Sequence, residues 1–194
     1  MDKELLSVLS CNQFLTEHEI QKITNLNCSL EEIHQELKKP ETNNLIIHYF
    51  FAKRYYWISK QHAKLSNLGN TAHQYLASRK KAQKLHTART CYHHIGGQLG
   101  VAIFKNFYES NKIDVLSFDK IFLTDKGKQF VSVNLKSHIP DKIRICVDFS
   151  ERRPHFAGKL GNSILENMIK LKQIAPATNR TLKVNREEVY NFGK

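Results

Sequence analysis

The chain has 194 residues, a net charge of +12 and a hydrophobic content of 41%, which suits one large or two small domains with a real core. No apolar run approaches the roughly 18 residues that a membrane span needs, and the N-terminus lacks the basic start and the small-residue cleavage site of a signal peptide, so we expect neither a membrane segment nor secretion. The cysteines, Cys11, Cys28, Cys91 and Cys146, are widely separated and form no C-x-x-C pair. This spacing is not that of a secreted disulfide-rich protein, so we expect their thiols to be reduced and the protein to be cytoplasmic.

Residues 1–60 have the pattern of a helix-turn-helix domain. Apolar residues on one face predict a first helix over residues 3–10. Two further helices each begin with a capping box, in which a Thr or Ser is followed three residues later by Glu. Pro40 is expected to end the third helix. The capping pairs are Thr16 with Glu19 and Ser29 with Glu32.

A β-hairpin is predicted to follow these helices. Residues 45–58 are β-branched and aromatic on both sides of Ala52 and Lys53. In a winged-helix domain this hairpin is the wing, and Lys53 and Arg54 would lie near its tip.

Residues 61–86 are predicted to form a basic linking helix. Their apolar residues have helical spacing, and no acidic residue interrupts the basic group Arg79, Lys80 and Lys81. Linking helices of this kind commonly pair across a dimer, so we expect a homodimer.

The positive charge is concentrated after residue 60. The net charge is −1 over residues 1–60, +5 over 61–86 and +8 over 87–194. Basicity of this size indicates a polyanionic partner, most often nucleic acid, and the alternative is a merely soluble basic surface.

The remainder, residues 87–194, contains an internal repeat with copies at about 87–140 and 141–194. Arg89 corresponds to Arg144 and Cys91 to Cys146. After a six-residue insertion in the second copy, the register holds at 61 positions from His94 and His155 onward. Two copies are too few for a solenoid and predict similar halves about a pseudo-twofold axis.

Each copy is predicted to contain an amphipathic helix that begins with small residues. In the first copy a short strand over 120–123 and a helix capped by Thr124 follow, which is the second half of a winged-helix unit. Glycine costs about 1 kcal/mol relative to Ala inside a helix. We therefore predict that the two helices cross at their small residues, with loose turns as the alternative; these residues are Gly97, Gly100, Gly158 and Gly161.

Cysteine and histidine recur together in the two copies. If the copies face each other, Cys91, His94, Cys146 and His155 could bind zinc, which accepts thiolate and imidazole ligands. The alternatives are small core cysteines with histidines that form hydrogen bonds at helix starts, a redox sensor, or an enzymatic Cys–His pair. No phosphate-binding loop, H-E-x-x-H sequence or elbow serine is present, so we expect no enzyme and no cofactor apart from zinc or another metal at these residues.

The insertion in the second copy contains two adjacent arginines, Arg152 and Arg153. Arginine captures anions in a bidentate manner, so the pair could bind an effector carboxylate or a DNA phosphate, or could pair with Asp148 or Glu151. The candidate effector-binding residues are Arg152, Arg153, His94 and His155.

These motifs resemble those of a long bacterial subgroup of ArsR-like winged-helix transcriptional regulators. That subgroup carries R-x-C-Y-x-H-x-x-G-x-L-G-V-A, then F-x-L-T-x-x-G, and W-S-E-R-R-x-H-x-A-G-x-L-G. The counterparts here are RTCYHHIGGQLGVA from Arg89 to Ala102, IFLTDKG from Ile121 to Gly127, and FSERRPHFAGKLG from Phe149 to Gly161. The resemblance covers residues 86–192 closely and 3–60 less closely, and it implies a dimeric, cytoplasmic regulator that binds double-stranded DNA.

The predicted third helix departs from that subgroup because it carries three glutamates, which repel phosphates. The E-x-C-x-C motif of the metal-sensing subgroup is also absent, and Cys28 is a single cysteine near the position that this motif would occupy. The candidate DNA-binding residues are Ser29, His34, Gln35, Lys38, Lys39, Lys53, Arg54, Arg79, Lys80 and Lys81. The expected fold is mainly α with small β-hairpins: an N-terminal winged helix-turn-helix, a linking helix and a C-terminal pseudo-twofold repeat.

The expected function is a DNA-binding transcriptional regulator that responds to a ligand or a metal. The alternative is a non-enzymatic module that binds a partner or ligand on a decayed helix-turn-helix scaffold.

Overall fold

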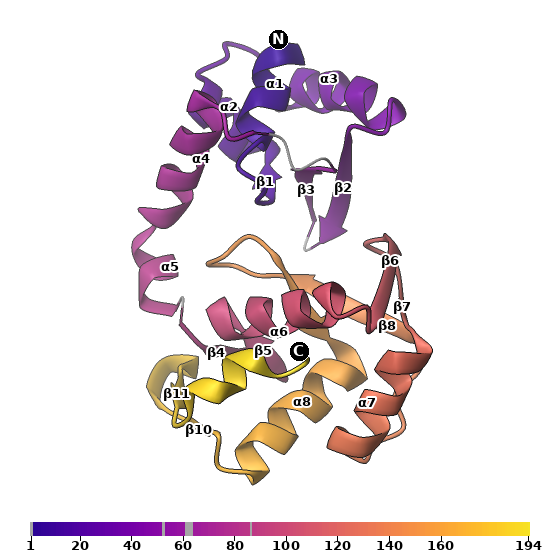
Figure 1. The fold of residues 1–194 in the computed structure, drawn as a ribbon. Coiled ribbons are helices and arrows are strands. Elements are labelled where there is room, and N and C mark those ends of the chain that lie inside the picture. The colour runs from indigo at the N-terminus through magenta and orange to yellow at the C-terminus, as the bar shows by residue number, and fades with distance from the viewer. Residues whose placement is uncertain (1, 52, 61–63, 86) are drawn as a thin grey trace. The chain divides into compact units, whose positions relative to one another are not determined.

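The computed structural model describes residues 2–51, 53–60, 64–85 and 87–194 (Figure 1). The chain divides into two compact units, Met1–Lys80 and Lys81–Lys194, each with its own hydrophobic core. No helix in the described residues combines the length and apolar character that crossing a bilayer requires.

The first unit is a small domain of helices and one antiparallel sheet. Its elements are α1 (Asp2–Leu9), β1 (Leu15–Thr16), α2 (Glu17–Thr24), α3 (Leu30–Thr42), β2 (Ile46–Phe51), β3 (Arg54–Ser59) and α4 (Asn67–Ala77). The three strands form an antiparallel sheet in the order β1-β3-β2. The helices and the sheet enclose a core that includes Leu5, Ile20, Ile33, Leu37, Trp57 and Leu76.

Both expected capping boxes are present. The Thr16 hydroxyl accepts a hydrogen bond from the Glu19 amide, and the Thr16 amide donates to the Glu19 carboxylate at 2.9 Å. Ser29 and Glu32 make the same pair of bonds at the start of α3. These local bonds explain why the starts of both helices can be read from the sequence.

Pro40 does not end the third helix, which continues to Thr42. Proline has no amide hydrogen and therefore removes one hydrogen-bond donor from the helix. Pro40 lies in the last turn of α3, so the helix continues for only two residues beyond it. The ring is buried, and the Pro40 carbonyl accepts a hydrogen bond from the Leu45 amide at 3.0 Å.

The helix expected over 61–86 is instead two helices, α4 and α5 (Lys80–Leu85); residues 61–63 and 86 lie outside the described residues. Ser66 caps α4, and Ala72 and Leu76 are buried in the first core. The first compact unit therefore extends to Lys80 and includes α4, because the apolar face of that helix packs within it.

The second unit contains the sequence repeat. Its further elements are β4 (Arg89–Cys91), β5 (His94–Gly96), α6 (Gly97–Glu109), β6 (Ile113–Ser117), β7 (Lys120–Leu123), α7 (Asp125–Leu135), β8 (Lys142–Val147), β9 (Pro154–Ala157), α8 (Gly158–Lys170), β10 (Ile174–Pro176), η1 (Thr178–Arg180), β11 (Leu182–Val184) and η2 (Glu187–Asn191). Strands β6-β7-β8-β9 form one sheet, while β4-β5 and β10-β11 are separate hairpins.

Each copy of the repeat therefore has the order hairpin, helix, hairpin: β4-β5-α6-β6-β7 and β8-β9-α8-β10-β11. The copies differ after the second hairpin. Thr124 caps the helix α7 in the first copy, whereas a short 3-10 helix, η2, follows the second hairpin of the second copy.

Gly100 of α6 and Gly161 of α8 lie against the opposite hairpin, which corrects the expected contact between two helices. A Cβ placed on Gly100 would lie 3.4 Å from the Cβ of His155, and one on Gly161 would lie 2.8 Å from the Cβ of His94. Gly97 has a different role. It adopts φ 75°, a left-handed conformation that favours glycine, at the point where β5 turns into α6.

Candidate functional site

Two of the candidate DNA-reading residues on α3, His34 and Lys38, are half-buried. His34 Nδ1 lies 2.6 Å from Glu17 Oε1. Lys38 Nζ lies 2.8 Å from Glu41 Oε2 and 5.4 Å from the centroid of the Trp57 ring. Both side chains therefore interact with groups of their own unit.

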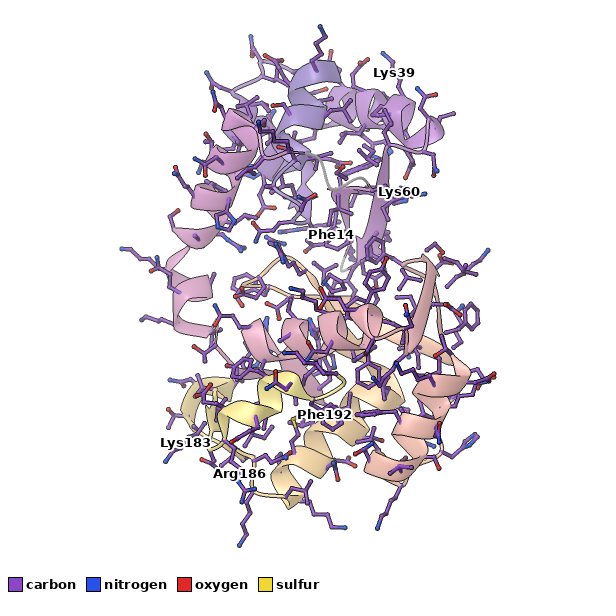
Figure 2. All side chains as sticks on the ribbon, in the orientation of Figure 1. Phe14, Lys39, Lys60, Lys183, Arg186 and Phe192 are labelled. Carbon is purple, nitrogen blue, oxygen red and sulfur yellow. The ribbon has the colours of Figure 1, made fainter. Side chains whose placement is uncertain are left out.

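Gln35 and Lys39 are exposed on α3, and each contacts a glutamate of the same helix. Gln35 Nε2 donates to Glu31 Oε1 at 3.2 Å, and Lys39 Nζ lies 2.5 Å from Glu36 Oε1. Figure 2 shows Lys39 projecting from the surface of the helix. Ser29 uses its hydroxyl to cap the helix. Both exposed side chains are thus already engaged by the helix itself, and the charge of Lys39 is partly neutralised by Glu36.

Lys53 and Arg54 lie where the β2–β3 hairpin turns. Lys53 adopts φ 62° between the strands, Arg54 is the first residue of β3, and both are exposed. Of the other basic candidates, Arg79 is half-buried and donates to the Leu76 carbonyl at 3.0 Å, whereas Lys80 and Lys81 are exposed.

The second unit brings the four candidate metal-binding residues together. Cys91 lies opposite His94 in the β4–β5 hairpin, and Cys146 lies opposite His155 in the β8–β9 hairpin. Their ligand atoms all lie within 4.8 Å of one another. We call Cys91, His94, Cys146 and His155 the Cys/His cluster.

The Cys/His cluster is enclosed by protein. His155 is fully buried, and Cys91, the most exposed member, is only 9% exposed. The two imidazole rings lie side by side with centroids 5.0 Å apart. His94 Nε2 and both ring nitrogens of His155 are buried without a hydrogen-bond partner among the described residues.

The two thiols of the cluster have different acidities. A hydrogen bond from Cys146 lowers the pKa of Cys91 below its usual value, and His155 and His94 add to this effect against the opposing effect of burial. The same bond to Cys91, together with burial, raises the pKa of Cys146. The cluster therefore favours a thiolate at Cys91.

A buried ion pair lies beside the cluster. Asp148 Oδ2 accepts a hydrogen bond from the Gly97 amide at 2.7 Å, forms an ion pair with Arg89 Nη2 at 2.9 Å, and lies 3.5 Å from His155 Nδ1. Asp148 Oδ1 accepts from the amide and hydroxyl of Ser150, each at 2.8 Å. Burial opposes ionisation, but His155, Arg89 and the amide donors keep the pKa of Asp148 below its usual value.

This ion pair breaks the symmetry of the repeat. Arg89 is 1% exposed, whereas its counterpart Arg144 is exposed. The last residue of β5 in the first copy is Gly96, and the last residue of β9 in the second copy is Ala157. A Cβ on Gly96 would lie 2.1 Å from Arg89 Nη1, so the glycine makes room for the buried guanidinium.

Sequence reasoning overlooked the pairing of Arg89 with Asp148. The sequence feature that could have indicated this pairing is Asp148 itself. This acidic residue lies two positions after Cys146, at the start of the insertion that only the second copy carries.

The candidate effector residues do not form one open site. Arg152 is buried and adopts φ 54°, and its amide donates to the Asp148 carbonyl at 3.0 Å. Arg153 is exposed, while His94 and His155 are buried in the Cys/His cluster. An effector bound by the exposed Arg153 would thus be separated from the histidines by protein.

The chain is similar to a curated bacterial protein. It is 36% identical over 103 residues to a protein of Bacillus subtilis (strain 168) that is named an uncharacterized HTH-type transcriptional regulator, YdfF. The match covers 48% of this chain and 44% of that protein, so the chain matches less than half of the relative's length. No model of a protein family and no solved structure matches the chain.

Proposed function

We propose that the protein is a DNA-binding transcriptional regulator whose first unit is a winged helix-turn-helix. The observation that carries the proposal is the succession of α2, a short turn, α3 and the β2–β3 hairpin, with Lys53 and Arg54 exposed at the hairpin turn. A helix of this kind enters the major groove, and an adjacent basic hairpin reaches the phosphates. The name of the Bacillus subtilis relative supports this assignment.

Helix α3 would contribute its exposed side, with Gln35 and Lys39. The ion pair between Lys39 and Glu36 is on the surface, with Lys39 60% exposed, and such pairs are weak. A phosphate can therefore replace Glu36 as the partner of Lys39. The hairpin and the basic residues near the unit boundary would supply most of the affinity, and sequence discrimination by α3 would be modest.

The test is binding to duplex fragments from the region upstream of the gene at several salt concentrations. Replacing Lys53 and Arg54 by Ala should weaken binding to all sequences and reduce the slope of log affinity against log salt by about 2. The matched control is Lys170→Ala with Lys183→Ala, which removes the same charge from exposed positions of the second unit. Equal losses in both variants would contradict a role for the hairpin.

A second candidate function is binding of a protein or ligand by a helix-turn-helix that has lost DNA recognition. The acidic partners of His34, Gln35, Lys38 and Lys39 favour it.

Glu31→Gln with Glu36→Gln distinguishes the two functions. If α3 lies at the DNA, removing two charges that repel phosphate should tighten binding by roughly 1–2 kcal/mol, or about five- to thirty-fold. Fluorescence anisotropy with a labelled duplex measures this change. An unchanged affinity would place α3 away from the DNA and favour the second function.

The remaining parts of the proposal follow from the resemblance to ArsR-like regulators. They are an ArsR-like type, action in the bacterial cytoplasm and a homodimer. Light scattering of the purified protein gives the oligomeric state directly.

A further inference from the structure

We propose that Cys91, His94, Cys146 and His155 bind one Zn²⁺ ion, which joins the two copies of the repeat. This site is distinct from the proposed DNA-binding surface, and its test does not depend on DNA binding. Each copy supplies one thiol and one imidazole from a single hairpin.

The distances suit a single ion. Zinc binds thiolate sulfur at about 2.3 Å and imidazole nitrogen at about 2.0–2.1 Å, so tetrahedral ligand atoms are roughly 3.3–3.8 Å apart. The four ligand atoms here lie within 4.8 Å of one another. Each Cys already lies opposite its His across a strand pair, so the four ligands belong to adjacent positions of two hairpins.

The buried nitrogens require a partner. His94 Nε2 and His155 Nε2 are enclosed without a hydrogen bond among the described residues. A buried polar atom without a partner costs about 1–3 kcal/mol. A metal ion between the imidazoles and the thiols satisfies both nitrogens at once.

The surroundings of His155 resemble those of a metal ligand. Its Nδ1 faces Asp148 Oδ2 at 3.5 Å, which leaves Nε2 for the ion. Histidine ligands commonly direct the second ring nitrogen toward a carboxylate, which fixes the ring orientation. Asp148 is itself held by the Gly97 amide and by Arg89.

The ligand types select the metal. Two thiolates and two imidazoles in tetrahedral arrangement suit Zn²⁺, whereas Mg²⁺ and Ca²⁺ require oxygen ligands. All four positions are filled by buried protein side chains, which is the arrangement of a structural site and leaves no open position for catalysis. Because the ligands come from both copies, binding of the ion is coupled to the association of the two hairpins.

The first experiment uses the whole 194-residue chain, stripped with a chelator under reducing conditions and then titrated with Co²⁺, followed by Zn²⁺. We expect one Co²⁺ per chain with the intense visible absorption of a tetrahedral ion and a thiolate charge-transfer band, both abolished by one equivalent of Zn²⁺. The weak absorption of an octahedral ion, or no binding, would overturn the proposal.

Paired variants locate the site. Cys91→Ser should remove the charge-transfer absorption or weaken it strongly, while Cys28→Ser, a change outside the second unit, should leave the spectrum of the parent. If Cys91→Ser does not fold, the unmodified protein provides a second test. Bound Zn²⁺ should protect two thiols per chain from a thiol reagent, and removal of the Zn²⁺ by a chelator should make these thiols reactive. Equal thiol reactivity with and without Zn²⁺, or a Cys91–Cys146 disulfide in place of bound metal, would show that the cluster is not a zinc site.

Discussion

Replacing Arg89 by Met should lower the free energy of unfolding of the second unit by about 3–5 kcal/mol. Arg89 is 1% exposed, and its guanidinium lies 2.9 Å from the fully buried carboxylate of Asp148. Methionine retains much of the side-chain volume but removes the charge. The carboxylate then stays in the interior without its cation, and the loss of one partner of a buried pair is far more costly than the loss of both.

The repeat offers a matched control for this change. Arg144 is the counterpart of Arg89 but is exposed, so Arg144→Met should change stability by less than about 0.5 kcal/mol. The double change Arg89→Met with Asp148→Asn should recover part of the loss, because no unpaired charge remains. Denaturant unfolding of the three variants gives these values. Similar losses for Arg89→Met and Arg144→Met would mean that the buried pair contributes little.

Replacing Gly100 by Leu should destabilise the second unit by about 3 kcal/mol, the upper part of the range for overpacking. A Cβ at this position would lie 2.2 Å from the Ile95 carbonyl oxygen and 3.4 Å from the Cβ of His155. The first neighbour is backbone and cannot move without disturbing β5. The second belongs to the Cys/His cluster, so the substitution should also weaken the binding of Co²⁺ or Zn²⁺.

The control is Gln98→Leu, which introduces the same side chain at an exposed position of the same helix. It should melt within a few degrees of the parent and bind metal normally. Thermal melting with and without Zn²⁺ measures both effects. A Gly100→Leu protein that melts like Gln98→Leu would show that α6 can move away from Ile95 and from the β8–β9 hairpin.

Several local features of the chain could be read from the sequence because short-range interactions produce them. The starts of α2 and α3 follow from hydrogen bonds between residues three apart, such as Thr16 with Glu19. The strand 120–123 and the helix capped by Thr124 were predicted at the positions where they occur. Pro40 was misjudged because the sequence alone does not show how much of the helix remains beyond it.

The surroundings of the candidate residues on α3 could not be predicted from the sequence. His34, Gln35, Lys38 and Lys39 were selected as polar side chains of a recognition helix. His34 lies against Glu17 of α2, and Lys38 lies over the ring of Trp57 in β3 in addition to its contact with Glu41 of its own helix. Hydrogen bonds and ring contacts between distant segments leave no regular spacing in the sequence.

The sequence by itself determined the repeat, its 61-position register and the four residues of the Cys/His cluster, because the same residue types recur at matching positions of the two copies. Only the tertiary structure decided that the two hairpins place these four side chains within 4.8 Å of one another, and that α6 and α8 pack against the opposite hairpins. It also decided that Arg89 is buried while Arg144 is exposed. The physical reason is that burial depends on which distant segments share a core. One acid in the insertion, Asp148, is enough to stabilise a buried charge in the first copy and not in the second.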